Sequence, residues 1–566
     1  MTVPTATSRE AVTRAVRCSI TLCVGVGVGL ALLPGPASAS PAAAATALPS
    51  ASMAPAAPVT STLARTDEGL RVASLAVPVA DAAARGAGTA AELAPTLVQP
   101  FGLVGVTWQA DTAPAGLSVQ VRLHQPDGWS DWQTLPYEAT EGPALDEESD
   151  ARPGTGPLWT GAADGVAARV TSSTGAAPSD LQVVTVDPGA GPGSSARGAA
   201  LDRPDSGAAI RKPPRFPTMP RVISRRQWGA NPKLTDSCDS PRYGRTAKMV
   251  FVHHTVNSNG YSRRESPAIV RAILAYHTQG QNWCDIGYNA LIDRFGNVFE
   301  GRRGGMRKPV RGAHAGDFNT GTVGVSLIGN FDVRRPSSRM KNALVRFIGW
   351  RLGTSYKPVR GVVGVNGQRF ARISGHRDAM ATACPGRFAY AQLPRIRHRV
   401  AAYLSRYHSK LARKAHHMGV HRTGQVWKGE RSLHGGFRTV FHNGWMFGKH
   451  GLGAHLLAGR VLKRYLATGG PTGLLGWPKT GMRKTPTKGF RVLVGQHGRM
   501  YMHRHATRKV IHGPIYRRYK ALGFASSRLG FPRTNVFRTG RGTRVNFQDG
   551  TITWNRNLRK TRVFYS

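Results

Sequence analysis

The chain has 566 residues, with 78 Lys and Arg against 30 Asp and Glu, and a formal net charge of +48. This length excludes a single small domain and predicts about three or four. The charge indicates a polyanionic partner: nucleic acid, acidic lipid or an anionic surface polymer. It is concentrated in the C-terminal part, because Glu430 and Asp549 are the only acidic residues beyond residue 400.

Residues 1–39 have the pattern of a secretory signal peptide. Three arginines precede the apolar run "CSITLCVGVGVGLALL", and an A-x-A cleavage pattern ends at Ala39. An uncleaved membrane anchor is the alternative, but the run is short and glycine-rich against the ~20 residues that a span needs. No later stretch is apolar enough to cross a bilayer. We therefore expect an exported, soluble mature chain without a transmembrane segment.

Export also changes the cysteine count. Cys18 and Cys23 leave with the signal peptide, so the mature chain keeps Cys238, Cys284 and Cys384. In an oxidising compartment, an odd number implies one disulfide and one cysteine with another role. We take Cys384 as the candidate for that other role.

The segment after the signal peptide predicts a spacer, a β-domain and a linker. Residues 40–65 are rich in Ala, Pro, Ser and Thr, which predicts disorder. Over 66–188, alternating runs such as "FGLVGVTWQ" and "LSVQVRLHQ" are separated by turn residues, which predicts an antiparallel β-sandwich. The stretch "DGWSDWQTL" predicts one more hairpin. Its Trp129 and Trp132 can stack on sugar rings, although packing within the sandwich is the favoured interpretation. A Gly/Pro/Ser-rich linker follows over 189–219.

Residues 220–407 alternate between β-rich and helical patterns, which predicts a mixed sheet covered by helices. Strands are expected at "MVFVHHTV", on both sides of the Phe-Gly-Asn turn in "YNALIDRFGNVFEG", and at "VGVSLIGNF". Helical periodicity in "ESPAIVRAILAYHTQ" and "SSRMKNALVRFIGWRLGTSY" predicts two helices, with Ser262 or Ser266 and Ser337 or Ser338 at their starts. A basic helix closes the unit.

The stretch "SGHRDAMATACPG" places His376 and Cys384 eight residues apart, which suits a loop that presents both to one point. Imidazole and thiolate are ligands of Zn²⁺. Side chains alternate along a strand, so His253 and His254 of "MVFVHHTV" point opposite ways and only one can join them. Such a tripod leaves a fourth position for water, which ionises near neutral pH on the metal and becomes a nucleophile. On spacing alone, a core histidine and a spare buried thiol are an equal alternative.

Five motifs in order, "VFVHHT", "WCDIGYNALID", "GNVFEGR", "GAHAGDFNTGTVGVSLIGNF" and "GHRDAMATACPG", resemble the peptidoglycan recognition protein and type 2 N-acetylmuramoyl-L-alanine amidase family. The resemblance covers about a third of the chain. It implies His253, His376 and Cys384 as the ligands of Zn²⁺. It also implies hydrolysis of the amide between the lactyl group of N-acetylmuramic acid and L-alanine of the stem peptide.

The same resemblance implies further site residues. Tyr288 of "DIGYN" assists catalysis, and its phenol can hydrogen-bond a developing oxyanion. Thr382 occupies the place where phage amidases carry a lysine, as in animal members that retain amidase activity; its hydroxyl donates a hydrogen bond but brings no positive charge. His314 and Asn319 of "GAHAGDFN" resemble substrate-groove residues, with a purely structural role as the alternative for each. His277 is expected to pack on its helix.

Receptor-only members of the family lack the cysteine ligand, so Cys384 favours an enzyme. A non-catalytic peptidoglycan-binding envelope protein is the alternative. A disulfide between Cys238 and Cys284 fits the same picture and would stabilise the domain by about 2–4 kcal/mol.

Residues 408–566 repeat themselves. "GRVLKRYLATGGPTGLLGWP" begins at Gly459 and "GPIYRRYKALGFASSRLGFP" at Gly513, with a partial repeat ahead of them. This pattern predicts tandem repeats of short strands and turns with one short helix each. Trp477 and Phe531 in them can contact wall glycan, but plugging each repeat's core is the favoured role.

The repeats resemble the LGFP repeats of secreted, wall-associated actinobacterial proteins, which implies attachment to peptidoglycan and anionic wall polymers. Nucleic acid is the competing partner for the charge, but export and the lack of a recognised nucleic-acid module argue against it. We expect a multidomain monomer, secreted and associated with the cell wall.

Overall fold

The structure is a computed structural model. It describes residues 62–65, 69–80, 88–137, 142–144, 148, 150–191, 217–235, 241–407, 409–487, 489–503 and 508–566. The predicted signal peptide, most of the predicted spacer and linker, and Cys238 lie outside these residues, so the predictions made for them remain expectations. No helix in the described ranges is both long and apolar enough to cross a membrane.

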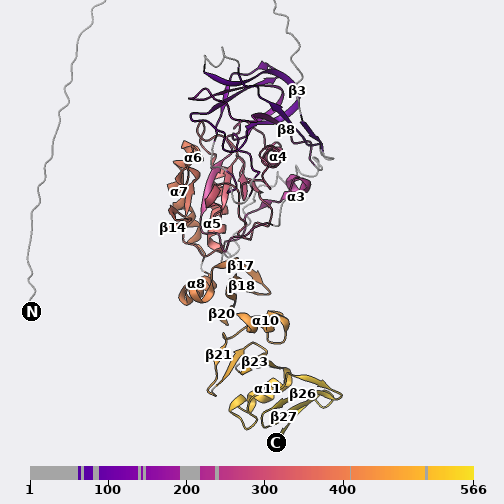
Figure 1. Cartoon of the computed structure of the whole chain (residues 1–566). Helices are drawn as coiled ribbons and strands as arrows, with labels where there is room; N and C mark the ends of the chain where they lie inside the picture. The colour runs from indigo at the N-terminus through magenta and orange to yellow at the C-terminus, as the bar shows by residue number, and fades with distance from the viewer. Residues whose placement is uncertain are drawn as a thin grey trace, which may run out of the picture. The chain divides into compact units, whose positions relative to one another are not determined.

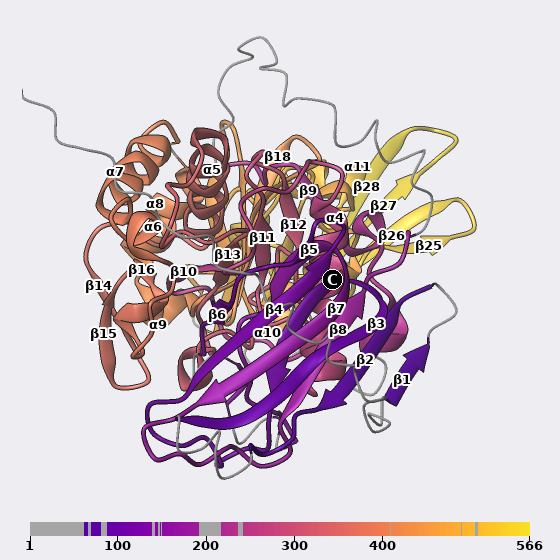
Figure 2. The same cartoon turned by 90° about the horizontal axis from the view of Figure 1, so that it is seen from above.

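The N-terminal part forms one eight-stranded sheet in the order β1-β2-β8-β3-β7-β4-β5, with β6 paired to β4; Figure 2 shows its main strands side by side. The strands are β1 (Thr62–Arg65), β2 (Arg71–Ala76), β3 (Thr89–Thr107), β4 (Ser118–Gln125), β5 (Gly128–Trp129), β6 (Gln133–Leu135), β7 (Leu158–Thr171) and β8 (Gln182–Asp187). All pairings are antiparallel, as predicted. The sandwich prediction is supported in part: residues of β2, β3, β4, β7 and β8 enclose one buried core, but hydrogen bonds join the strands into one continuous sheet. Register shifts between the long strands β3 and β7 let that sheet bend.

Two details of this part differ from the sequence interpretation. Strand β1 falls inside the predicted spacer 40–65, so the sheet begins before residue 66. Strands β5 and β6 each pair with β4 instead of forming a hairpin with each other. Trp129 and Trp132 are half-buried beside a guanidinium, since Arg122 lies 5.8 Å from the ring of each. This cation–π packing agrees with a role within the domain.

The central part contains the predicted mixed sheet, six-stranded in the order β16-β10-β13-β11-β12-β9. The strands are β9 (Val222–Ile223), β10 (Val250–His254), β11 (Ala290–Ile292), β12 (Val298–Glu300), β13 (Gly324–Leu327) and β16 (Ile373–Gly375). Strands β16, β10, β13 and β11 are parallel, and β12 turns back antiparallel to β11 after the Phe-Gly-Asn turn. Strand β10 is buried along its whole length, as is usual for parallel strands covered on both faces.

Within the described residues of this segment, the α-helices are α3 (Arg225–Trp228), α4 (Ser266–Ala275), α5 (Ser338–Thr354), α6 (Arg387–Tyr390) and α7 (Leu393–Leu404). Helix α5 begins after Ser337, whose hydroxyl accepts a hydrogen bond from the Met340 N–H at 3.1 Å. Helix α4 has Glu265 at its N-cap instead of a predicted serine. The predicted closing helix is two helices, and Pro394 lies in the first turn of the second.

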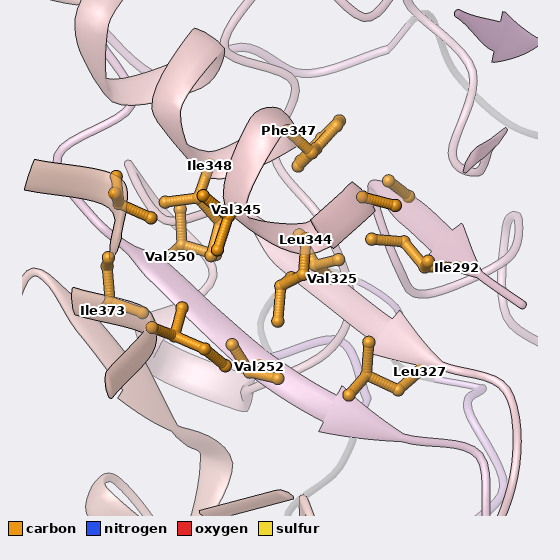
Figure 3. Packing of buried hydrophobic residues seen from close by; sticks show 14 of the residues in the cluster. Val250, Val252, Ile292, Val325, Leu327, Leu344, Val345, Phe347, Ile348 and Ile373 are labelled. Atoms are coloured by element: carbon orange, nitrogen blue, oxygen red, sulfur yellow. The ribbon is translucent and has the colours of Figure 1, made fainter. Parts of the chain in front are cut away.

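Helices α5 and α7 cover one face of the central sheet. Figure 3 shows Val250 and Val252 of β10 and Val325 of β13 under Leu344 and Ile348 of α5. Each of these side chains is fully buried, so their burial fixes α5 on the sheet. Because strand side chains alternate, the residues between them point to the opposite face.

That opposite face is covered by helix α4 and by a hairpin that was not predicted, β14 (Val362–Val365) and β15 (Gln368–Ala371). Phe251 of β10 packs against Phe370 of the hairpin, with ring centroids 5.3 Å apart. Leu291 and Phe299 share a buried cluster with α4. His253, two residues after Phe251, therefore lies on the face between α4 and the hairpin.

Helix α4 also packs on the N-terminal sheet. One buried cluster joins Ile269 and Ile273 of α4 to Leu103 of β3 and to Val184 and Val186 of β8. The two parts thus share a continuous apolar core.

The C-terminal part is rich in strands, as predicted, and contains three four-stranded antiparallel sheets with short helices ahead of the first sheet and between the sheets (Figure 1). The sheets are β17 (Val426–Leu433) to β20 (Gly453–Leu457), β21 (Arg483–Lys484) to β24 (Lys509–His512), and β25 (Phe537–Thr539) to β28 (Lys560–Tyr565). The helices are α8 (Lys410–Met418), α9 (Val420–Thr423), α10 (Gly459–Ala467) and α11 (Gly513–Ala521).

The two full repeats use equivalent residues in the same way. The hydroxyl of Tyr465 donates to the carbonyl of Gly476 at 2.8 Å, and that of Tyr519 donates to the carbonyl of Gly530 at 2.6 Å. The aromatic residues that follow these glycines are buried in the repeat cores. Trp477 and Phe531 therefore hold the repeats together, which is the favoured one of their two predicted roles.

Candidate metal centre

Two neighbouring parallel strands bring the candidate histidines together. His253 lies near the end of β10, and His376 follows directly after β16. Because the two strands are parallel and paired, their carboxyl ends meet at the same edge of the sheet. Cys384 reaches this edge from the loop after His376, in which the Arg377 N–H donates to the Cys384 carbonyl at 2.9 Å.

The three side chains form a compact, buried cluster. One nitrogen of each histidine and the sulfur of Cys384 all lie within 4.8 Å of one another. The sulfur is 3.7 Å from Nδ1 of His253. Tetrahedral zinc with Zn–S of about 2.3 Å and Zn–N of about 2.05 Å separates such a pair by about 3.6 Å. The donor types and their spacing therefore fit Zn²⁺.

The surroundings favour the protonation states that a metal needs. Burial lowers the pKa of His253 well below its usual range, and the nearby His376, His314 and His254 lower it further. A neutral imidazole keeps a lone pair for coordination. The backbone N–H of His254 donates to the Cys384 sulfur at 3.4 Å, which favours the thiolate.

The side chain of His254 points to the other face of the strand, as alternation predicts. Its Nδ1 accepts a hydrogen bond from the Phe331 N–H at 3.2 Å, and its Nε2 lies 3.9 Å from the Asp332 carboxylate. His254 therefore contributes its backbone, and not its imidazole, to the cluster.

The two predicted catalytic residues lie beside the cluster. The ring of Tyr288 is 5.4 Å from the ring of His253, centroid to centroid, and only 4% exposed. The hydroxyl oxygen of Thr382 accepts a hydrogen bond from the Cys384 N–H at 2.9 Å. Thr382 thus holds the backbone of the cysteine, a positioning contact that the sequence pattern did not reveal.

His314 and Asn319 are both fully buried. The Asn319 side-chain oxygen accepts hydrogen bonds from the N–H groups of His314 and Ala315, at 2.8 Å and 3.0 Å. Nδ1 of His314 lies 3.1 Å from Nε2 of His253. For both residues, these contacts favour the structural role over contact with the substrate.

His277 is more closely tied to the site than its sequence position indicated. Its Nδ1 accepts a hydrogen bond from the Gly287 N–H at 3.1 Å. Its ring lies 4.4 Å from that of Trp283 and 5.8 Å from that of Tyr288. Burial, with a contribution from the nearby charge of Arg302, lowers the pKa of His277 to about 3. A neutral His277 therefore packs against the ring of Tyr288.

The disulfide prediction is not tested by the structure. Cys238 lies outside the described residues, and Cys284 is partly buried, with its N–H donating to the Glu148 carboxylate at 2.9 Å. The pairing of Cys238 with Cys284 remains a prediction.

Comparisons with known proteins give matches for the N-terminal and central parts of the chain. A family model described as N-acetylmuramoyl-L-alanine amidase matches residues 243–387, which contain the whole cluster. A second model, described as Rv3811 N-terminal galactose-binding domain-like, matches residues 49–191.

Individual relatives cover the same central region. Peptidoglycan-recognition protein SC1a/b of Drosophila simulans is 30% identical over 171 residues, which are 29% of this chain and 80% of that protein. Peptidoglycan recognition protein 1 of Mus musculus is 32% identical over 166 residues, 29% of this chain and 81% of that protein. The solved structure of wild-type Drosophila PGRP-LB shares 29% identity and covers 30% of this chain and 91% of its own, with a TM-score of 0.26.

The chain is thus a multidomain protein, with a galactose-binding-like domain at its N-terminal end, an amidase-type α/β domain in the centre and a strand-rich C-terminal region. It belongs to the family of peptidoglycan recognition proteins and N-acetylmuramoyl-L-alanine amidases.

Proposed function

We propose that this protein is a secreted, zinc-dependent amidase that hydrolyses the bond between N-acetylmuramic acid and L-alanine of the peptidoglycan stem. The observation that carries the proposal is the buried cluster of His253, His376 and Cys384, whose donor atoms lie within 4.8 Å of one another inside the amidase-matching segment. Two imidazoles and one thiolate are the donor set of a catalytic zinc site with an open position.

Zn²⁺ held there would supply Lewis acidity, which polarises the scissile carbonyl and makes water nucleophilic at neutral pH. The protein's own groups would hold the cysteine ligand in place and stabilise the oxyanion. The His254 N–H donates a hydrogen bond to the Cys384 sulfur, and Thr382 holds the backbone of the same cysteine. The phenol of Tyr288, beside the His253 ring, would donate a hydrogen bond to the oxyanion as the carbonyl becomes tetrahedral.

The C-terminal repeats would hold the enzyme at the wall. Helices α10 and α11 expose basic side chains, among them Lys463, Arg517 and Lys520. Several weak contacts from tandem units add up, because each later contact is intramolecular. We therefore propose anionic wall polymers as the partner of the repeats.

Binding of peptidoglycan without turnover is the second candidate, since the two relatives above are named recognition proteins. One experiment separates the two. The full chain is loaded with zinc, its zinc content is measured, and it is incubated with purified cell walls while new L-alanine amino termini are counted. We expect one zinc per chain and steady release of amino termini that a chelator abolishes. Wall binding without any release would favour the recognition function.

A further inference from the structure

The N-terminal sheet holds the amidase domain at the end of helix α4. The hydroxyl of Tyr276 donates to the carbonyl of Thr155 at 2.9 Å and lies 3.3 Å from that of Val106. A Cβ atom at Gly105 would lie 2.4 Å from the Tyr276 ring, so the strand must have glycine where the tyrosine packs. The docking is therefore specific as well as apolar.

A second contact lies nearer the metal cluster. The carboxylate of Glu148 forms a 2.7 Å ion pair with Arg302 and accepts a hydrogen bond from the Cys284 N–H at 2.9 Å. The Glu148 and Arg302 side chains are only 10% and 13% exposed. An ion pair shielded in this way resists salt screening better than an exposed one.

The third contact is made by Gly142. Its carbonyl accepts hydrogen bonds from the side-chain amide of Asn319, at 2.9 Å, and from the Gly316 N–H, at 3.1 Å. A Cβ atom at Gly142 would lie 2.9 Å from the Trp283 ring, and its φ of +137° is also unusual for other residues. Only glycine fits this close approach without displacement.

Gly142 begins a chain of hydrogen bonds that ends at the metal cluster. Asn319, held by Gly142, accepts from the backbone N–H of His314 at 2.8 Å. The ring of His314 then lies against that of His253, with 3.1 Å between Nδ1 and Nε2. The other nitrogen of His253, Nδ1, faces the sulfur of Cys384.

We propose that the N-terminal domain is a structural component of the metal centre, because Gly142 positions the ligand His253 through Asn319 and His314. The partner of the non-coordinating nitrogen fixes the tautomer and orientation of a ligating histidine. Coordination through Nδ1 leaves the proton of His253 on Nε2, where it is donated to Nδ1 of His314. His314 and Asn319 are then positioning residues, which deepens the proposed function and rests on its metal.

The test uses the full chain loaded with Co²⁺, whose visible absorption reports ligand geometry, together with zinc affinity measured by chelator competition. Asn319→Asp keeps the acceptor for the His314 N–H but replaces the donor to Gly142 with an oxygen. Gly142→Ala displaces the same carbonyl from the other side. Each variant is expected to weaken zinc binding roughly 10- to 100-fold and to shift the cobalt bands.

The double variant is expected to bind zinc no more weakly than the worse of the two single variants, because both substitutions break the same hydrogen bond between Asn319 and Gly142. Trp159→Phe is the matched control. It removes the hydrogen bond from the Trp159 indole to Glu265, 3.3 Å long, at the same domain interface but outside the chain to His253. This control should lower thermal stability and leave the cobalt spectrum and zinc affinity unchanged.

Unchanged cobalt bands and zinc affinity in both Asn319→Asp and Gly142→Ala would overturn the inference, as would equal losses in Trp159→Phe. Failure of the proposed function is a distinct result, because it would show in the unaltered chain, either as no binding of Zn²⁺ and Co²⁺ or as bound zinc without release of L-alanine amino termini. If Asn319→Asp does not fold, Gly142→Ala alone decides, because it changes no residue of the amidase domain.

Discussion

The sulfur of Cys384 lies 3.7 Å from Nδ1 of His253, although 131 residues separate the two in the chain. Parallel pairing of β10 with β16 creates this contact, by placing His253 and the start of the cysteine-bearing loop at the same edge of the sheet. The cluster therefore depends on the fold of the whole central domain and not on any single motif.

Replacing Cys384 by serine should abolish hydrolysis and most zinc binding while the domain stays folded. Serine removes the thiolate, a strong ligand at neutral pH, and the sheet and its helices pack independently of that sulfur. Zinc content by atomic absorption and a thermal unfolding midpoint close to that of the unaltered chain would check this. Full activity with stoichiometric zinc would remove Cys384 from the site.

His254→Ala is the control for that experiment. Its imidazole faces Phe331 and Asp332 instead of the cluster, so the variant should retain zinc. The Phe331 N–H would lose its buried acceptor, at a cost of about 1–3 kcal/mol in stability. Loss of zinc in this variant would show that strand alternation does not select the ligand.

Tyr288→Phe should lower kcat roughly 10²- to 10³-fold, because the phenol is the proposed donor to the oxyanion. The ring keeps its packing against His253 and His277, so zinc content and thermal stability should not change. Steady-state kinetics on purified walls measure the effect. An unaltered kcat would assign Tyr288 to packing alone.

Gly105→Ala should destabilise the chain by about 1–3 kcal/mol, since the added methyl would overlap the Tyr276 ring at 2.4 Å. Gly156→Ala is matched to it, because the neighbours of a Cβ there are 3.8 Å away, at ordinary contact distance. Scanning calorimetry should show a lower unfolding temperature for the first variant only. Equal curves would mean that the two domains are not held by this contact.

Stability should fall as the pH is lowered below about 6.5, in part through His277. The pKa of His277 is near 3 in the folded chain against 6.5 for an ordinary histidine, so the unfolded chain binds the proton first. Between these values the folded state loses stability with decreasing pH, by about 2 kcal/mol from pH 7 to 5 for this group. The unfolding temperature of His277→Gln should therefore drop less over that range. Parallel curves would show that His277 does not contribute.

Wall binding by the full-length Cys384→Ser chain should weaken steeply with salt. Exposed charges are screened within ~8–10 Å at 0.1–0.15 M ionic strength. Because Trp477 and Phe531 are buried, we expect no salt-resistant fraction and full competition by heparin. Pelleting with purified walls measures this, and changing Lys463, Arg517 and Lys520 to Gln should lower the bound fraction. Absence of binding even at low salt would remove the anchoring role.

The central domain was largely predictable because its signals are local. Continuous apolar runs marked the buried strands, the Phe-Gly-Asn turn joined β11 to β12, and Ser337 capped α5. The N-terminal sheet was less predictable. Pro126-Asp127-Gly128 marks the turn between β4 and β5, but no local residue specifies that β6 also pairs with β4.

In the candidate site, too, the features with a local sequence signal were predicted and the contacts between distant residues were not. Alternation along β10 separated His253 from His254, and the spacing of His376 and Cys384 indicated a loop site. The contacts of Gly142 with Asn319, 177 residues apart, and of Glu148 with Arg302, 154 residues apart, join different domains and leave no pattern in either segment. Thr382 likewise gave no sign that its hydroxyl would hold the Cys384 backbone.

The most direct test of the proposed activity uses a defined muramyl peptide and the zinc-loaded full chain in water enriched in ¹⁸O. The products are separated and weighed by mass spectrometry. Cleavage of the lactyl–L-alanine amide predicts one ¹⁸O in the muramic acid carboxylate and an unlabelled peptide with a free L-alanine amino terminus. An intact substrate in the presence of one bound zinc per chain, or the label in a different carboxyl group, would contradict the proposed activity.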